Sequence, residues 1–66
     1  MYELQISFNN FHTIKTYMKN MPNLDRVIRE AKYQASITPI DSGVTYRVSN
    51  TDVVLFEIAA YEPVKV

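Results

Sequence analysis

His12 is the only side chain in the sequence that titrates near neutral pH, which makes it the first candidate for acid–base chemistry. A catalytic histidine also needs a neighbouring group that orients it and a nucleophile or substrate pocket beside it. The sequence identifies neither of these. We therefore expect His12 to have a structural role, partly buried at the end of a β-hairpin.

Seven carboxylates are the other candidates for metal binding or acid–base work, because the chain has no cysteine and a single histidine. Either role needs at least two of them to converge. Glu3 and Glu57 are both expected on one sheet face, at a separation that depends on strand order. We expect solvated surface charges and predict no metal, no cofactor and no disulfide. The seven are Glu3, Asp25, Glu30, Asp41, Asp52, Glu57 and Glu62.

Seven basic residues balance the seven acidic ones, so the formal net charge is zero. This balance argues against sequence-independent nucleic-acid binding, which depends on neutralising phosphates. Arg26, Arg29 and Lys32 are interleaved with Asp25 and Glu30, a pattern typical of a solvated helix surface. A neutral surface also favours self-association of small proteins.

The length and composition indicate one folded domain over residues 1–66. The hydrophobic fraction of 47% is ordinary for a folded protein and too high for a disordered one. No apolar run approaches the roughly 20 residues that a membrane span requires, and no signal peptide is visible at Met1. These observations predict a cytoplasmic protein without a membrane partner.

The segment Pro22–Ser36 is the one run with a clear helical period. Asn23 is a plausible N-cap, and Asp25 places a negative charge where the helix dipole favours it. Poor helix formers and then Pro39 follow Ser36, so we expect the helix to end there. Its apolar stripe consists of Leu24, Val27, Ile28, Ala31 and Ala35.

Two segments predict a first β-hairpin. Tyr2–Phe8 alternates between apolar and polar residues without a fault. Phe11–Met18 also fits a helical period, but its β-branched and aromatic residues favour a strand. A three-residue loop, Asn9-Asn10-Phe11, keeps Lys15 off the apolar face and is the register we prefer. It places four residues on the face of Leu4 and Ile6: His12, Ile14, Thr16 and Met18.

Val44–Asn50 and Val53–Tyr61 predict a second hairpin around Asn50-Thr51-Asp52. The register that buries the most apolar side chains pairs Val48 with Val54, Tyr46 with Phe56 and Val44 with Ile58, with Ala60 behind them. The outer face then carries Thr45, Arg47, Ser49, Val53, Leu55, Glu57, Ala59 and Tyr61.

The connection Ile37–Gly43 contains the loop-forming residues that separate the helix from the second hairpin. We expect Ile37 and Ile40 to reach the core and Gly43 to supply a positive φ. The predicted fold is α+β with the order ββαββ. A four-stranded, largely antiparallel sheet carries one helix on one face and leaves the other face open.

The open face is the predicted working surface. Exposed apolar area on a small protein usually marks a protein interface, and tyrosine is enriched there. The predicted partner-binding residues are Tyr17, Arg47, Val53, Leu55 and Tyr61. An alternative is nucleic-acid binding by base stacking and cation contacts on the same face. The residues for that alternative are Lys15, Tyr17, Arg47 and Tyr61.

A hairpin, one helix and a second hairpin in 66 residues resemble, in size and plan, small phage or mobile-element proteins that bind and inhibit a host enzyme. The resemblance implies an inhibitor and carries no residue roles. Two layers built from 66 residues leave little room for a substrate pocket. We therefore predict a non-enzymatic interaction module that binds another protein or itself as a homodimer, through the open face or an unpaired edge strand.

Overall fold

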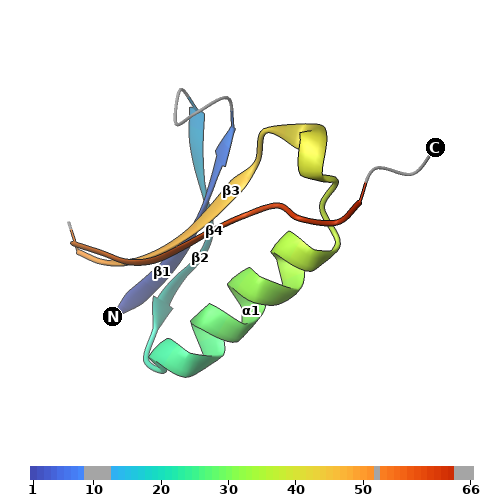
Figure 1. The fold of residues 1–66 in the computed structure, drawn as a ribbon. Coiled ribbons are helices and arrows are strands. Elements are labelled where there is room, and N and C mark those ends of the chain that lie inside the picture. Colours follow the sequence, from blue (N-terminus) through green and yellow to red (C-terminus); the bar gives the residue numbers. More distant parts are fainter. Residues whose placement is uncertain (9–12, 52, 64–66) are drawn as a thin grey trace.

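The computed structural model describes residues 1–8, 13–51 and 53–63, and within them the predicted ββαββ order is confirmed (Figure 1). The strands form one antiparallel sheet in the order β2-β1-β3-β4, so β2 and β4 are its edges. The elements are β1 (Tyr2–Phe8), β2 (Thr13–Met21), α1 (Leu24–Ser36), the short 3-10 helix η1 (Ile40–Ser42), β3 (Thr45–Asn50) and β4 (Val53–Ala59).

Helix α1 begins and ends where the sequence predicts. The Oδ1 atom of Asn23 accepts a hydrogen bond of 3.2 Å from the backbone N–H of Arg26, so Asn23 is the N-cap. The helix ends at Ser36, and the hydroxyl of Thr38 donates to the carbonyl of Gln34 at 2.7 Å. This bond satisfies one of the carbonyls that a helix end leaves without a partner.

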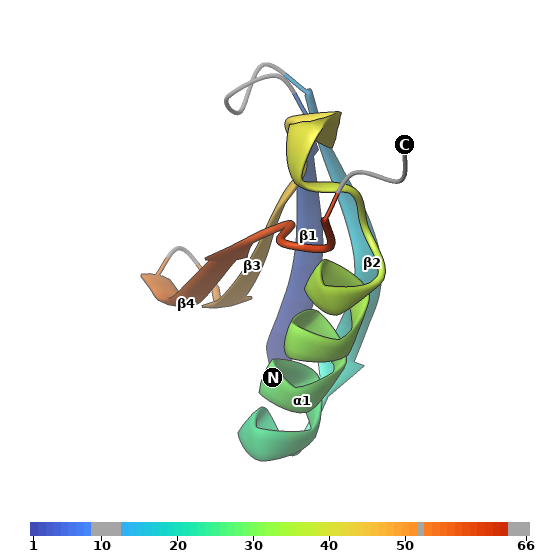
Figure 2. The ribbon, with the colours of Figure 1, turned by 45° about the vertical axis from the view of Figure 1, so that its right-hand side comes forward.

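The helix lies along one face of the sheet and forms the second layer, packed against β1, β3 and β4 (Figure 2). The buried stripe of the helix is the predicted one, and the central strands supply the opposing side chains. The buried hydrophobic residues are Leu4, Val27, Ala31, Ala35, Val44, Tyr46, Val48 and Ala60. Partly buried residues complete the core: Tyr2, Ile6, Met18, Met21, Leu24, Ile28, Phe56 and Ile58.

The second segment is a strand, as predicted, but the register of the first hairpin is not the predicted one. Ile6 pairs with Lys15 and Ser7 with Ile14, so four residues rather than three separate β1 from β2. Ile14 therefore lies on the uncovered face, and Lys15 on the side of the helix. Lys15 is nevertheless exposed, because β2 is an edge strand and the helix packs mainly over β1, β3 and β4.

A β-bulge then changes the alternation within β2. Gln5 pairs with Thr16, but the preceding residue of β1, Leu4, pairs with Met18, which leaves Tyr17 as the extra residue of β2. Met18 packs against the core as predicted. Thr16 lies on the uncovered face, contrary to the prediction. Alternation alone cannot reveal a bulge, since one extra residue reverses every side chain that follows it.

The second hairpin has the predicted core face but different cross-strand partners. Tyr46 pairs with Ile58 and Val48 with Phe56, two residues away from the predicted pairing of Val48 with Val54. All four of these paired residues belong to the core, as the sequence predicted. Val54 does not belong to the core, and the residue is 44% exposed.

A second bulge explains the position of Val54. Val48 pairs with Phe56 and Ser49 with Val54, so Leu55 is the extra residue in β4. Val54 consequently shares the uncovered face with Ser49, and the predicted burial of Val54 is wrong.

The connection between α1 and β3 follows one prediction and contradicts another. Gly43 has φ of 75°, the left-handed conformation expected of the chain's single glycine. Ile37 and Ile40 do not reach the core, since they are 48% and 58% exposed. The helix cap and η1 hold their backbone at the surface instead.

After β4 the chain leaves the sheet and runs beside this connection. The backbone N–H of Tyr61 donates to the carbonyl of Ala35 at 3.0 Å. Glu62 then bonds through its backbone to Thr38 and Ile40, at 3.1 and 2.7 Å. These bonds fasten Tyr61 and Glu62 to the C-terminus of α1 and to the segment that follows it.

Candidate functional site

A polar row crosses the uncovered face of the sheet. The register aligns Thr16, Gln5, Arg47 and Glu57 as cross-strand neighbours on β2, β1, β3 and β4. The Nε of Arg47 donates to Oε1 of Gln5 at 3.2 Å, and Nε2 of Gln5 donates to Oε2 of Glu3 at 3.3 Å. Arg47 is thus on the uncovered face, as predicted, and its guanidinium is held by the neighbouring strand.

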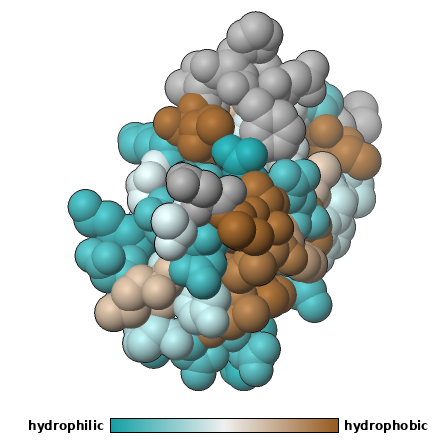
Figure 3. All heavy atoms as spheres, turned by 90° about the vertical axis from the view of Figure 1, so that its left-hand side faces the viewer, coloured by the Kyte–Doolittle hydropathy of each residue, from teal (hydrophilic) through white to brown (hydrophobic). Residues whose placement is uncertain are grey.

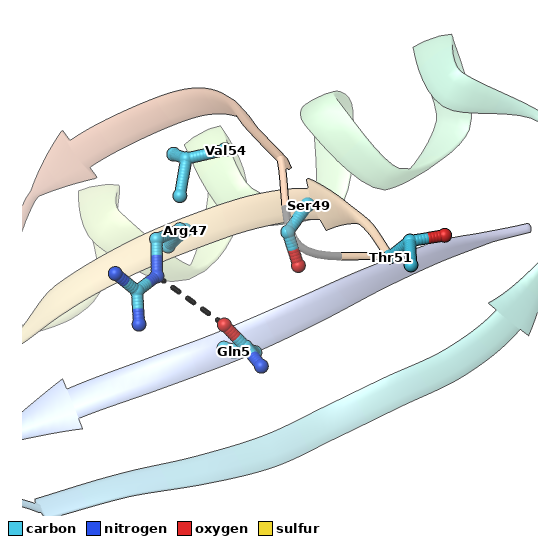
Figure 4. A pocket seen from close by; sticks show the side chains of 5 residues that line it. All are labelled: Gln5, Arg47, Ser49, Thr51 and Val54. Atoms are coloured by element: carbon cyan, nitrogen blue, oxygen red, sulfur yellow. Dashed lines mark hydrogen bonds between the residues drawn. The ribbon is translucent and has the colours of Figure 1, made fainter.

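A shallow hollow of about 220 Å³ adjoins this row (Figure 4). Ser49, a small residue, pairs with Val54 and lies two residues from Arg47 on β3. The described residues that line the hollow include no carboxylate and no histidine. They therefore lack the general base that a nucleophile–base pair requires. The lining residues are Gln5, Arg47, Ser49, Thr51 and Val54.

The predicted position of Tyr17 on the open face is wrong. Its hydroxyl accepts a hydrogen bond of 3.4 Å from Nε2 of Gln34, a residue of α1, so the ring lies on the helix side of the sheet. The one-residue shift in the register of the first hairpin causes the reversal, because it puts Lys15 on the helix side and Thr16 on the uncovered face. Tyr61 is also not on the open face, because it follows β4 and its backbone bonds to the end of α1.

Val53 and Leu55 differ from the prediction because of the bulge in β4. Val53 pairs with Asn50, which in turn pairs with the core residue Tyr2, so the register assigns Val53 to the helix side. Leu55 is the unpaired bulge residue, and the alternation no longer assigns it to the open face. Of the predicted partner-binding residues, Arg47 lies where the sequence placed it, and Tyr17, Val53 and Tyr61 do not.

The four residues of the nucleic-acid alternative are not brought together. Lys15 pairs with Ile6 on the helix side, whereas Arg47 lies on the uncovered face. Tyr17 and Tyr61 both bond to α1, at Gln34 and Ala35, away from the uncovered face that carries Arg47. No continuous groove of cations and aromatic rings arises from this set.

Edge strand β4 carries the most concentrated exposed apolar surface on the sheet. Val53, Val54 and Leu55 follow one another and are 59%, 44% and 44% exposed. The end of the β3–β4 hairpin projects beyond the helix (Figures 1 and 2). Seen from that side, a continuous hydrophobic area lies near the centre of the surface, with smaller separate patches above it (Figure 3). The sequence signal was the run of three apolar residues at 53–55, which strict alternation does not produce.

The rest of β4 is covered on its helix side. Phe56 and Ile58 pack against the core, and the Nζ of Lys32 lies 5.7 Å from the centroid of the Phe56 ring. This cation–π contact and the stem of Lys32 shield the ring from water. The exposed apolar surface is therefore confined to the first half of the strand.

Edge strand β2 has a different character. Lys15 and Lys19 are exposed, and the pairing with β1 is irregular at two places. Asn20 has φ of 58°, which interrupts the extended backbone near the end of the strand. Lysines and bulges are the features that prevent a sheet edge from pairing with another chain. Strand β4 has one bulge and a single charged residue, Glu57.

No three histidine, cysteine or acidic side chains of the described residues gather into a group that could bind a metal. Glu30 accepts from Nε2 of Gln34 at 2.9 Å, a local contact on the helix. His12 and Asp52, which were also considered from the sequence, lie outside the described residues.

Comparisons with protein-family models, with curated proteins and with solved structures found no match. Within the described ranges, no helix has both the length and the apolar character that crossing a membrane requires. The physical character of the surface therefore carries the functional argument.

Proposed function

We propose that the protein is a small protein-binding module that acts by strand addition at the free edge of β4. The observation that carries the proposal is the exposed apolar run Val53–Leu55 on an edge strand with one charged residue. An exposed apolar sheet edge with few charges is a template for pairing with another chain. In such complexes main-chain hydrogen bonds supply affinity, and alternate side chains supply specificity.

The free energy expected from burying the side chains at 53–55 agrees with this mode of binding. Fully burying a valine or leucine side chain contributes about 1.5–3 kcal/mol, and these three side chains are roughly half exposed. Their complete burial would thus contribute about 3 kcal/mol in total. Micromolar affinity needs about 8 kcal/mol, so the backbone hydrogen bonds and further side-chain contacts must contribute the larger share.

Protein binding fits the surface better than nucleic-acid binding does. The formal charge is zero, and Lys15 and Arg47 lie on opposite sides of the sheet. The apolar run on β4 offers no contact that a phosphate backbone requires. The resemblance in size and plan to small inhibitors of host enzymes is compatible with a protein partner.

The proposal is tested by placing a lysine on each sheet edge in turn. Val54→Lys alters β4, and Ile14→Lys is the matched control on β2, because the two side chains are 44% and 46% exposed on the same face. Both variants and the unaltered protein are immobilised and exposed to extract of the source organism. Loss of a specific partner protein from Val54→Lys alone supports the proposal. Retention of every partner by Val54→Lys contradicts it.

A further inference from the structure

We infer that the strand that pairs with β4 is the β4 strand of a second copy of this chain, in an antiparallel, two-fold symmetric dimer. The inference rests on the proposed function, since it names the partner of the same edge. It would join two four-stranded sheets into one continuous sheet.

The difference between the two edges of the sheet is the first argument. The β2 edge has two exposed lysines, two register irregularities and the positive φ of Asn20, whereas the β4 edge has none of these lysines and one bulge. Pairing of β4 with β4 leaves both protected β2 edges at the outside. The assembly therefore closes at two copies.

The alternative arrangement would not close. Pairing of β4 with the β2 strand of the next copy is a head-to-tail contact that repeats without limit and produces filaments. Lys15, Lys19 and the irregular backbone of β2 oppose that contact. When two β4 strands pair, the lysines and the irregular backbone of β2 lie at the far edge of each sheet and do not oppose the contact.

The charge pattern of β4 is compatible with its own copy. Glu57 is the only charged residue of the strand. In an antiparallel pair the two Glu57 side chains oppose each other only when the two-fold axis passes through that position. A register centred on Phe56, for example, places Glu57 opposite Leu55 of the other copy and keeps the run at 53–55 beside residues 57–59 of the partner strand. The zero net charge of the chain adds no general repulsion between copies.

The two-fold symmetry determines where the helix-covered and uncovered faces of the two sheets lie in the dimer. A two-fold axis perpendicular to the sheet places both helices on one side, and both uncovered faces on the other. The apolar runs at 53–55 then lie along the same joint, where each is shielded by the partner. Burial of this area explains why a small chain carries it at a sheet edge.

Sedimentation velocity of the purified full chain across micromolar concentrations tests the inference. We expect a species of twice the 7.7 kDa chain mass that dissociates on dilution. Val54→Lys should raise the dimer dissociation constant at least about tenfold, because it places an unpaired cation at the joint. Ile14→Lys should leave the constant unchanged. Circular dichroism establishes that both variants fold.

Amide hydrogen exchange provides a second readout that does not need a variant. In the dimer, outward-facing amides of β4 become more protected as concentration rises, and those of β2 do not. A 7.7 kDa species at every concentration, or a dimer that Ile14→Lys disrupts and Val54→Lys does not, overturns the inference. A monomer that still loses a captured partner on Val54→Lys refutes the dimer alone. A monomer whose captured partners are unaffected by Val54→Lys refutes both the dimer and the proposed function.

Discussion

The hydroxyl groups of Thr38 and Tyr46 lie 2.8 Å apart and form a hydrogen bond between the segment after α1 and the central strand β3. Tyr46 is 5% exposed, so its polar end is removed from water and needs this partner. The Thr38 hydroxyl also donates to the Gln34 carbonyl at 2.7 Å. This hydrogen bond therefore connects the end of α1 to β3, a central strand whose opposite side is part of the uncovered face.

Replacing Tyr46 with Phe removes this bond and keeps the ring. We expect the free energy of unfolding to fall by about 1 kcal/mol, the usual net contribution of one hydrogen bond. Urea unfolding monitored by circular dichroism measures the change. Tyr61→Phe is the control, since Tyr61 is 49% exposed and should change stability little. Equal effects of the two variants would contradict the structural role of the Thr38–Tyr46 bond.

Gly43→Ala should destabilise the protein through its backbone alone. The residue has φ of 75°, which costs an L-amino acid about 1–2 kcal/mol, while an added Cβ would meet no atom within 4 Å. Gly43→Asn should cost less, because asparagine tolerates this conformation better. The midpoints of thermal unfolding give the order of the three proteins. A midpoint for the alanine variant equal to that of the native chain would refute the conformational argument.

The sequence predicted the elements well because their signals are local. The helical stripe from Leu24 to Ala35 and the Asn23 cap depend on neighbours within one or two turns. The same holds for Gly43, whose conformation follows from the turn that it occupies. The alternating segments before and after the helix then predicted the ββαββ order.

Register was harder to predict because it depends on contacts between strands. The extra residues Tyr17 and Leu55 each reverse the alternation, and neither position has a glycine or proline that would signal a bulge. Both were among the predicted interface residues, and the shifted register of the first hairpin places Tyr17 on the helix side. Lys15 added to the error, since a lysine on an edge strand can face the helix side and still reach water.

Ser7→Ala should leave stability unchanged or increase it by up to about 1 kcal/mol. The Oγ of Ser7 is buried and, among the described residues, has no hydrogen-bond partner. A buried hydroxyl without a partner is costly, and alanine removes the group without a large cavity. Urea unfolding of the native and substituted chains gives the difference. A loss of more than about 1 kcal/mol would show that the hydroxyl has a stabilising partner in solution.

Leu55→Glu separates an interface role from a core role for the bulge residue. Leu55 is 44% exposed and unpaired in the register, so we expect the variant to fold with a change in unfolding free energy of about 0.5 kcal/mol or less. The added carboxylate should abolish dimer or partner binding, because strand pairing at β4 would bury it beside Glu57.

Tyr33→Glu is the control for that charge. Tyr33 is 59% exposed on α1, so the substitution changes the net charge equally and leaves β4 unaltered. Circular dichroism and sedimentation velocity of both variants distinguish the outcomes. If Leu55→Glu unfolds the chain, Leu55 belongs to the core. If it folds and associates as the Tyr33 variant does, the β4 edge is not the binding surface.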